Sequence, residues 1–246
     1  MSDSIAVEFC NVSKRFRDRD VLKDISFQIA RGEVLCILGR SGVGKSITLK
    51  LMIGLLQADK GEVRIGSEDI SHFNEDNLSR IRRKMGFLFQ SAALFDSFSV
   101  GDNLALPLKR LAKGKSQDEV NQEVDEALRQ VGLEQDKAKM PAELSGGMRK
   151  RAGLARAMVL NPQILLIDEP ASGLDPITAS EIDDLLLAVK KQRNTTMVIV
   201  THDIRGARKI ADKVAVIDGG ALVAFGSFAD LEQNQNHTVR KLLSET

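Results

Sequence analysis

Apolar residues along the chain gather in short continuous runs, and turn residues separate these runs. Continuous runs of this length are typical of strands that are buried on both faces of a sheet. The first 33 residues and the segment 61–70 instead predict strands joined by tight turns, with Arg31-Gly32 as one turn signal. The buried strands are predicted in the segments 34–39, 84–90, 163–169, 195–203 and 213–218.

Helical patterns occupy the segments between the later strands. Ser116 and Glu119 have the spacing of a capping box, and apolar residues repeat behind them at helical spacing until Gly132 ends the run. Met140-Pro141 breaks the chain before the next helical stretch. Further helices are predicted from about Ser46 to Leu56, over 179–192 and over 204–212.

Strands that alternate with helices indicate an α/β fold with a mostly parallel sheet. The helix-rich segment 91–160 interrupts this alternation, so we expect it to form an inserted helical subdomain. The strands nearest the start predict an N-terminal antiparallel β subdomain. Residues 1–246 are therefore interpreted as a single domain, whose core consists of 1–90 and 161–246.

Charge and cysteine content narrow the class of protein. The 35 basic and 34 acidic side chains give a net charge of +1, which argues against a dedicated nucleic-acid binder. Cys10 and Cys36 are too few for a disulfide framework, and their apolar surroundings predict buried, reduced thiols in a cytoplasmic protein. The start carries no signal-peptide pattern, and no apolar run reaches the length of a membrane span. Any role at a membrane would therefore require a partner.

The segment GRSGVGKS follows a predicted strand and precedes a predicted helix. It fits the P-loop pattern, in which glycines bring the backbone close to phosphate oxygens. Lys45 is expected to reach the terminal phosphates, and Ser46 to bind Mg²⁺. The fold prediction becomes a P-loop NTPase core, with ATP and Mg²⁺ as cofactors. The nucleotide-binding residues expected here are Gly39, Arg40, Ser41, Gly42, Val43, Gly44, Lys45, Ser46 and Ile47.

Polar residues stand at the ends of three other apolar runs. Asp168 ends an apolar strand in the Walker B arrangement and is expected to hold Mg²⁺. Glu169 follows at once, where a carboxylate can orient or deprotonate an attacking water. His202 is expected to contact the γ-phosphate, and Gln90 to contact the metal or the water.

The segment LSGGMRKR places Ser145, Gly146 and Gly147 at the start of a helix whose first turns are basic. A helix N-terminus already carries partial positive charge, so Arg149, Lys150 and Arg151 predict a bound anion nearby. We interpret this stretch as the second half of the triphosphate site. The sequence leaves open whether the two halves meet in one chain or between two chains.

The P-loop, Gln90, LSGG, LLIDEP, SGLD and His202, in this order and spacing, closely resemble the nucleotide-binding subunit of an ABC transporter. The resemblance implies a head-to-tail homodimer, in which Ser145 and Gly147 of one chain close on ATP held by the other. It also implies that Asp175 belongs to the loop that couples the two sites, and that Phe16 stacks on adenine. Met148 departs from the usual LSGGQ signature, which leaves the backbone and Ser145 to contact phosphate.

The segments LSGGMRKR and FLFQSAALFDSFSVGDNLALPL resemble ATPase subunits of Mla- and Mce-associated phospholipid transporters. This resemblance implies an integral membrane permease, a lipid-binding accessory protein and a place on the cytoplasmic face of the inner membrane. Two alternatives stay open: an importer ATPase for a polar solute such as an amino acid, and a soluble ABC ATPase without a permease.

The segment that follows Gln90 is unusually apolar, with Leu94, Phe95 and Phe98 close together. In ABC subunits this region lines the groove that receives a coupling helix of the permease. We therefore expect Leu94 or Phe95 to be partly exposed in the isolated subunit. The alternative is that the whole segment packs inside the helical subdomain.

Overall fold

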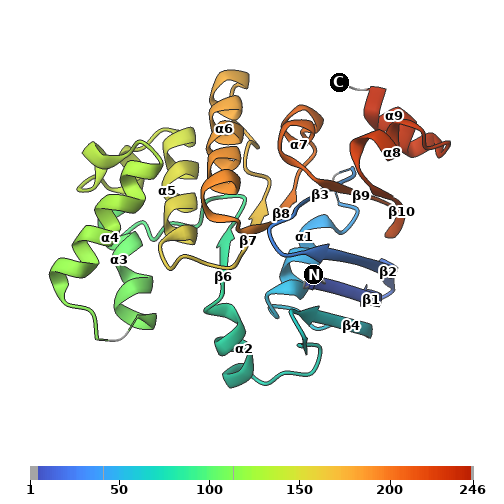
Figure 1. Ribbon diagram of the computed structural model, residues 1–246, viewed down its shortest axis with the longest axis horizontal. Coiled ribbons are helices and arrows are strands. Elements are labelled where there is room, and N and C mark those ends of the chain that lie inside the picture. The colour runs from blue at the N-terminus through green and yellow to red at the C-terminus, as the bar shows by residue number, and fades with distance from the viewer. Residues whose placement is uncertain (1–4, 41, 113, 245–246) are drawn as a thin grey trace.

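The computed structural model describes residues 5–40, 42–112 and 114–244, which form two sheets with helices around them (Figure 1). The larger sheet has the strand order β10-β9-β3-β8-β7-β6, and its pairs are parallel except that β10 runs antiparallel to β9. This confirms the predicted α/β fold. Its strands are β3 (Val34–Leu38), β6 (Met85–Leu88), β7 (Ile164–Asp168), β8 (Thr196–Val200), β9 (Lys213–Asp218) and β10 (Ala221–Gly226).

Apolar side chains cover the larger sheet on both faces. Successive residues of a strand point to opposite faces, so Cys36 and Leu38 of β3 belong to one core while Leu35 and Ile37 belong to the other. This two-sided burial explains why the strands are continuous apolar runs rather than alternating ones. Cys36 is buried as expected, whereas Cys10 is only half-buried.

The smaller, antiparallel sheet packs on one face of the larger sheet, together with α1 (Lys45–Met52) and α2 (Glu75–Arg82). The sequence patterns did not indicate α2. It begins after Asn74, whose side chain accepts a hydrogen bond from the Asn77 N–H. The helix α1 is shorter than expected, because Gly54 adopts a positive φ of 67° just beyond its end. The strands of this sheet are β1 (Ile5–Phe16), β2 (Arg19–Ala30), β4 (Lys60–Ile65) and β5 (Glu68–Asp69).

The other face of the larger sheet is covered by the remaining helices. In Figure 1 the helices α3, α4 and α5 stand together beside β6, at one end of the molecule. The expected capping box is present at the start of α4, between Ser116 and Glu119. The division of the chain into 1–90, 91–160 and 161–246 stays a prediction. The helices are α3 (Val100–Leu111), α4 (Gln117–Gln130), α5 (Gly146–Met158), α6 (Pro176–Arg193), α7 (Ile204–Ile210), α8 (Phe228–Glu232) and α9 (His237–Ser244).

Within the part of the chain that the structure describes, none of the helices combines the length and apolar character needed to cross a bilayer.

Two carboxyl groups approach each other between α6 and α7. Asp183 of α6 is buried, and Asp203 caps the start of α7 by accepting from the N–H groups of Arg205 and Gly206. A Cβ at Gly206 would lie 2.7 Å from Asp183 Oδ2 and 2.9 Å from Asp203 Oδ2, so both carboxyls press against this glycine. Burial, followed by the charge of Asp203, raises the pKa of Asp183 to about 6.

Asp183→Asn is expected to stabilise the protein more at neutral than at acidic pH. The folded protein binds a proton at Asp183 up to about pH 6, whereas the unfolded chain releases it near pH 4, so wild-type stability falls across this window as pH rises. Asparagine removes that dependence. The gain in unfolding free energy should be about 2 kcal/mol larger near pH 7.5 than near pH 4.5. Denaturant unfolding measures this, and an equal gain at both pH values would contradict the assignment.

Candidate functional site

The P-loop joins β3 to α1 at the carboxyl edge of the larger sheet. Gly44 sits at the helix start with φ of 103°, and a Cβ there would lie 2.9 Å from the carbonyl oxygen of Val21. Gly39 is equally restricted, because its Cβ would lie 2.3 Å from the carbonyl oxygen of Ile217. These close approaches explain why glycine is required at both positions. The expected ligand Ser41 lies outside the described residues.

Lys45 begins α1 and is buried, with its ammonium turned back over the loop. Its Nζ donates to the carbonyl oxygens of Gly39 at 2.7 Å and Arg40 at 3.1 Å. The same Nζ lies 3.7 Å from Glu169 Oε1. The ammonium therefore stands between the loop and the carboxylate, where a phosphate oxygen can exchange for the carbonyl contacts.

Ser46 and Asp168 meet directly, although they come from α1 and β7. The Ser46 Oγ donates to Asp168 Oδ1 over 2.8 Å. Burial raises the pKa of Asp168, the Ser46 hydrogen bond lowers it, and the Glu169 charge raises it further. A hydroxyl beside a desolvated carboxylate is a donor set that suits Mg²⁺, which binds few protein oxygens and completes its shell with phosphate and water. The donor set at this position therefore fits the expected metal.

Glu169 has an unusual backbone that directs its side chain into the site. Its φ of 48° lies in the left-handed region, and its N–H donates to the Val200 carbonyl over 2.8 Å. The side chain is nearly buried, and its Oε2 lies 2.7 Å from Nδ1 of His202. The His202 side chain is 63% exposed, so this pair reaches from the sheet edge to the surface.

A cavity of about 440 Å³ is lined by several of the predicted residues, although neither Asp168 nor His202 is among them. Phe16 forms one wall with 41% of the residue exposed, so a ring face is available to a flat ligand. Gln90 forms another wall, and its Nε2 lies 3.5 Å from the Ser172 hydroxyl. Val21 was not foreseen, since an apolar residue in a hairpin carries no chemical signal. The cavity is lined by Phe16, Val21, Gly42, Gly44, Lys45, Ser46, Ile47, Gln90 and Glu169.

Ser145, Gly146, Gly147 and Asp175 belong to a different surface. Ser145 and Asp175 cap the starts of α5 and α6, accepting from the N–H groups of Met148 and Thr178 respectively. A Cβ at Gly147 would lie 2.4 Å from Thr178 Cγ2, so the glycine allows these two helix starts to touch. Among the residues that line the described cavity, none comes from this surface. The second half of the predicted anion site therefore does not line the cavity of its own chain.

The basic residues at the start of α5 have partners inside the chain, so their presence does not by itself indicate a bound anion. Arg149 Nη1 donates to the Leu144 carbonyl over 2.6 Å, and Arg151 Nη2 lies 3.2 Å from Glu181 Oε2. Lys150 is buried, and its Nζ donates to the carbonyl oxygens of Gln90 and Glu169. These cations have internal partners, which local sequence could not reveal.

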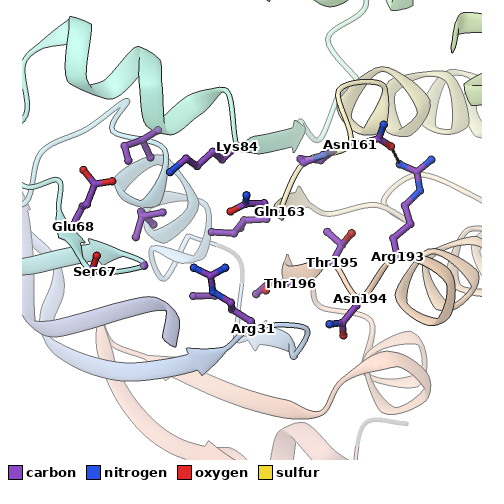
Figure 2. A pocket seen from close by; sticks show the side chains of 16 residues that line it. Arg31, Ser67, Glu68, Lys84, Asn161, Gln163, Arg193, Asn194, Thr195 and Thr196 are labelled. Atoms are coloured by element: carbon purple, nitrogen blue, oxygen red, sulfur yellow. Dashed lines mark hydrogen bonds between the residues drawn. The ribbon is translucent and has the colours of Figure 1, made fainter. Parts of the chain in front are cut away.

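A second hollow of about 370 Å³ lies at the opposite edge of the larger sheet (Figure 2). Lys84, Gln163 and Thr195 line it where β6, β7 and β8 begin, and Arg31 reaches in from the turn after β2. Arg193 is held there by Asn161, over 2.7 Å. None of the predicted nucleotide-binding residues that the structure describes lines this hollow. The carboxyl edge therefore remains the candidate site.

The chain resembles known proteins over nearly its whole length. It is 41% identical over 244 residues to the probable ribonucleotide transport ATP-binding protein mkl of Mycobacterium leprae, covering 99% of this chain and 70% of that one. It is 36% identical to the methionine import ATP-binding protein MetN of Clostridium tetani, covering 97% and 74% respectively.

A solved structure gives the same result for the fold. The dimeric ATP-binding cassette MJ0796, in a post-hydrolysis state with ADP and Pi, superposes with a TM-score of 0.84 at 33% identity, covering 90% of this chain and 98% of that one. The sequence profile of the ABC transporter family matches residues 22–172. The chain therefore belongs to the ABC transporter family, as an ATPase subunit of a membrane transport system.

Proposed function

We propose that this chain binds MgATP in the cavity at the carboxyl edge and that hydrolysis there drives a separate permease that moves phospholipids. The observation that carries the proposal is the convergence of Lys45, the Ser46–Asp168 pair and the Glu169–His202 pair on one site. Phosphoryl transfer needs little covalent chemistry from a protein, so positioning and charge supply most of the catalysis.

Each group at the site has a proposed role. Lys45 exchanges its carbonyl contacts for phosphate oxygens, and Glu169 orients the attacking water and accepts its proton. His202 holds the Glu169 carboxylate and reaches the γ-phosphate, while Phe16 stacks on adenine. Ser46, Asp168 and Gln90 would hold Mg²⁺, which supplies charge neutralisation of the phosphates when bound.

We further propose that two copies assemble head to tail, so that Ser145, Gly146, Gly147 and Asp175 of one copy close over the cavity of the other. Two features of the surface support this arrangement. The starts of α5 and α6 lie outside the cavity of their own chain. Ile177, beside Asp175, is an apolar residue left 75% exposed. The related cassette MJ0796 is also dimeric.

The phospholipid cargo is the finer part of the proposal. It rests on the resemblance of the segments 87–108 and 144–157 to phospholipid transporter ATPases. The relatives carry names for other cargoes, a ribonucleotide for mkl and methionine for MetN, so a polar-solute importer is the second candidate. A lipid-binding accessory protein would accompany the phospholipid system.

Co-purification with the membrane subunit tests the cargo and the transport role together. Mass spectrometry of the detergent-purified complex should find bound phospholipid, and phospholipid vesicles should alter the ATPase rate of the reconstituted complex. A complex whose ATPase responds to methionine or ribonucleotides and holds no phospholipid would contradict the lipid assignment. A chain that purifies with no membrane subunit would favour the soluble alternative.

Lys45→Ala should weaken ATP binding and abolish measurable hydrolysis. The lost charge-assisted contact to phosphate contributes roughly 1.5–3 kcal/mol in the ground state, and more where charge develops during transfer. Nucleotide binding by fluorescence and phosphate release both measure this. Turnover close to that of the wild type would remove Lys45 from the proposed site.

Glu169→Gln should keep ATP binding and lower the hydrolysis rate by about 10²- to 10⁴-fold, because the amide keeps the shape of the side chain but cannot accept a proton. ATP should then hold the protein as a dimer, visible by light scattering. Rapid hydrolysis by this variant would assign the attacking water to another group.

Phe95→Asp should prevent assembly with the permease while leaving ATP binding intact. Phe95 is 50% exposed, as expected for a docking residue, and buried Asn103 holds its main chain through hydrogen bonds to the Phe95 N–H and carbonyl. Burying an aromatic anchor at a protein interface is worth upwards of about 2 kcal/mol, so recovery of the permease in a pull-down should fall by more than roughly tenfold.

The matched control is Phe225→Asp. Phe225 is an exposed phenylalanine on β10, at the edge of the sheet opposite β6, so its replacement should leave assembly unchanged. If Phe95→Asp assembles normally, or loses ATP binding and folding as well, the apolar segment serves the packing of the subunit.

A further inference from the structure

Lys150 is a buried cation that joins two parts of the catalytic site from behind. It lies on α5 with 6% of the residue exposed, and its Nζ donates to the Gln90 carbonyl over 2.5 Å and to the Glu169 carbonyl over 2.7 Å. These two residues are 60 and 19 positions away along the chain. One ammonium therefore ties the ends of the strands β6 and β7 to the helix α5.

The contact to Glu169 fixes a strained backbone. A side-chain-bearing residue in the left-handed region costs roughly 1–2 kcal/mol, so it persists only where its surroundings hold it. The Glu169 N–H is held by the Val200 carbonyl, and its own carbonyl is held by Lys150. With both main-chain groups fixed, the side chain is directed toward Lys45 and His202.

The contact to Gln90 lies beside a second strained segment. Ala92 and Ala93 also adopt left-handed backbone, with φ of 62° and 48°. Arg156, further along α5, donates to the carbonyl oxygens of both alanines. The helix α5 therefore holds this segment at the carbonyl groups of Gln90, Ala92 and Ala93.

The charge of Lys150 is balanced within the site. Burial lowers the pKa of Lys150, but the carboxylates of Glu169 and Asp168 oppose this shift. A buried ammonium needs such partners, since an uncompensated one is costly. The two carbonyl contacts and the two nearby carboxylates together explain how a lysine is retained inside this interface.

We propose that Lys150 is a positioning residue of the ATPase reaction, whose ammonium fixes the main chains of Glu169 and Gln90 so that both side chains face the γ-phosphate. Lys150 does not contact the reacting atoms itself. It acts through Glu169, so the inference rests on the role proposed above for that residue. Because Lys150 lies on α5, whose start is capped by Ser145, it also connects the surface proposed to contact the second copy with Glu169 of the same chain.

The test compares three variants in the full-length protein, with ATP hydrolysis, ATP binding and Tm measured for each. Lys150→Met keeps the length of the side chain but removes both hydrogen bonds. Lys150→Gln restores an N–H donor without the charge. Lys190→Met is the control, since Lys190 donates to the Ile210 carbonyl over 3.1 Å and to Asp212 Oδ1 over 2.7 Å but lies on α6, away from the cavity.

Lys150→Met should lower kcat by roughly 10²-fold with KM for ATP changed less than about threefold, as expected when a catalytic group is misplaced by about 1 Å. The kcat of Lys150→Gln should be at least about tenfold higher than that of Lys150→Met, because glutamine can still donate a hydrogen bond to a carbonyl. Lys190→Met should keep the wild-type kcat and KM.

Several results would overturn the proposal. One is a kcat for Lys150→Met within about threefold of the wild type. Another is a methionine variant that fails to fold, or one whose ATP binding and Tm fall together with its kcat. Either result would mean that Lys150 contributes to stability alone. A glutamine variant no better than the methionine variant would also overturn it. Glu169→Gln, assayed beside these variants, distinguishes failure of this proposal from failure of the role proposed for Glu169. Rapid ATP hydrolysis by Glu169→Gln would contradict the role of Glu169, independently of the results for the Lys150 variants.

Discussion

Main-chain hydrogen bonds at the carboxyl edge of the larger sheet bring the residues of the candidate site together. Beyond the strand ends, the Thr201 N–H donates to the Ile37 carbonyl and the Glu169 N–H donates to the Val200 carbonyl. These bonds extend the pairing of β3, β8 and β7 by one step. As a result the P-loop, the two acidic residues and His202 emerge side by side, although the chain places them far apart. Ligand sites of open α/β sheets commonly lie at this edge.

Buried charge is concentrated at the same edge and is balanced there. Lys45 and Lys150 both contact Glu169 of the buried pair Asp168 and Glu169, Lys45 from the end of the P-loop and Lys150 from α5. Each cation therefore offsets part of the cost of burying the two carboxylates. The strained backbone of Glu169 is maintained by the same contacts. Glu169 is therefore held by several internal contacts, an arrangement of the kind that favours catalysis by preorganised charge.

The residues of the cavity concern the ATPase activity and not the molecule that is transported. The cavity is lined by residues of the proposed nucleotide site, and relatives carry names for different transported molecules. Function of this kind is located in sites and partners rather than in the fold. The exposed Phe95 is a candidate contact to such a partner, and the starts of α5 and α6 are a candidate contact to a second copy.

The sequence by itself determined the buried strands, the P-loop, the acidic pair at the end of β7 and the capping box of α4. Each of these depends on spacing or periodicity within a few residues, which local sequence expresses directly. It did not reveal α2, whose short helix depends on packing Leu78 and Ile81 into the core. Lys150 was misinterpreted as part of an anion site because its contacts, like those of α2, are made only in the tertiary structure. Its partners lie 60 and 19 residues away, and the destination of a buried polar group is decided only when the tertiary fold brings such partners within hydrogen-bonding distance.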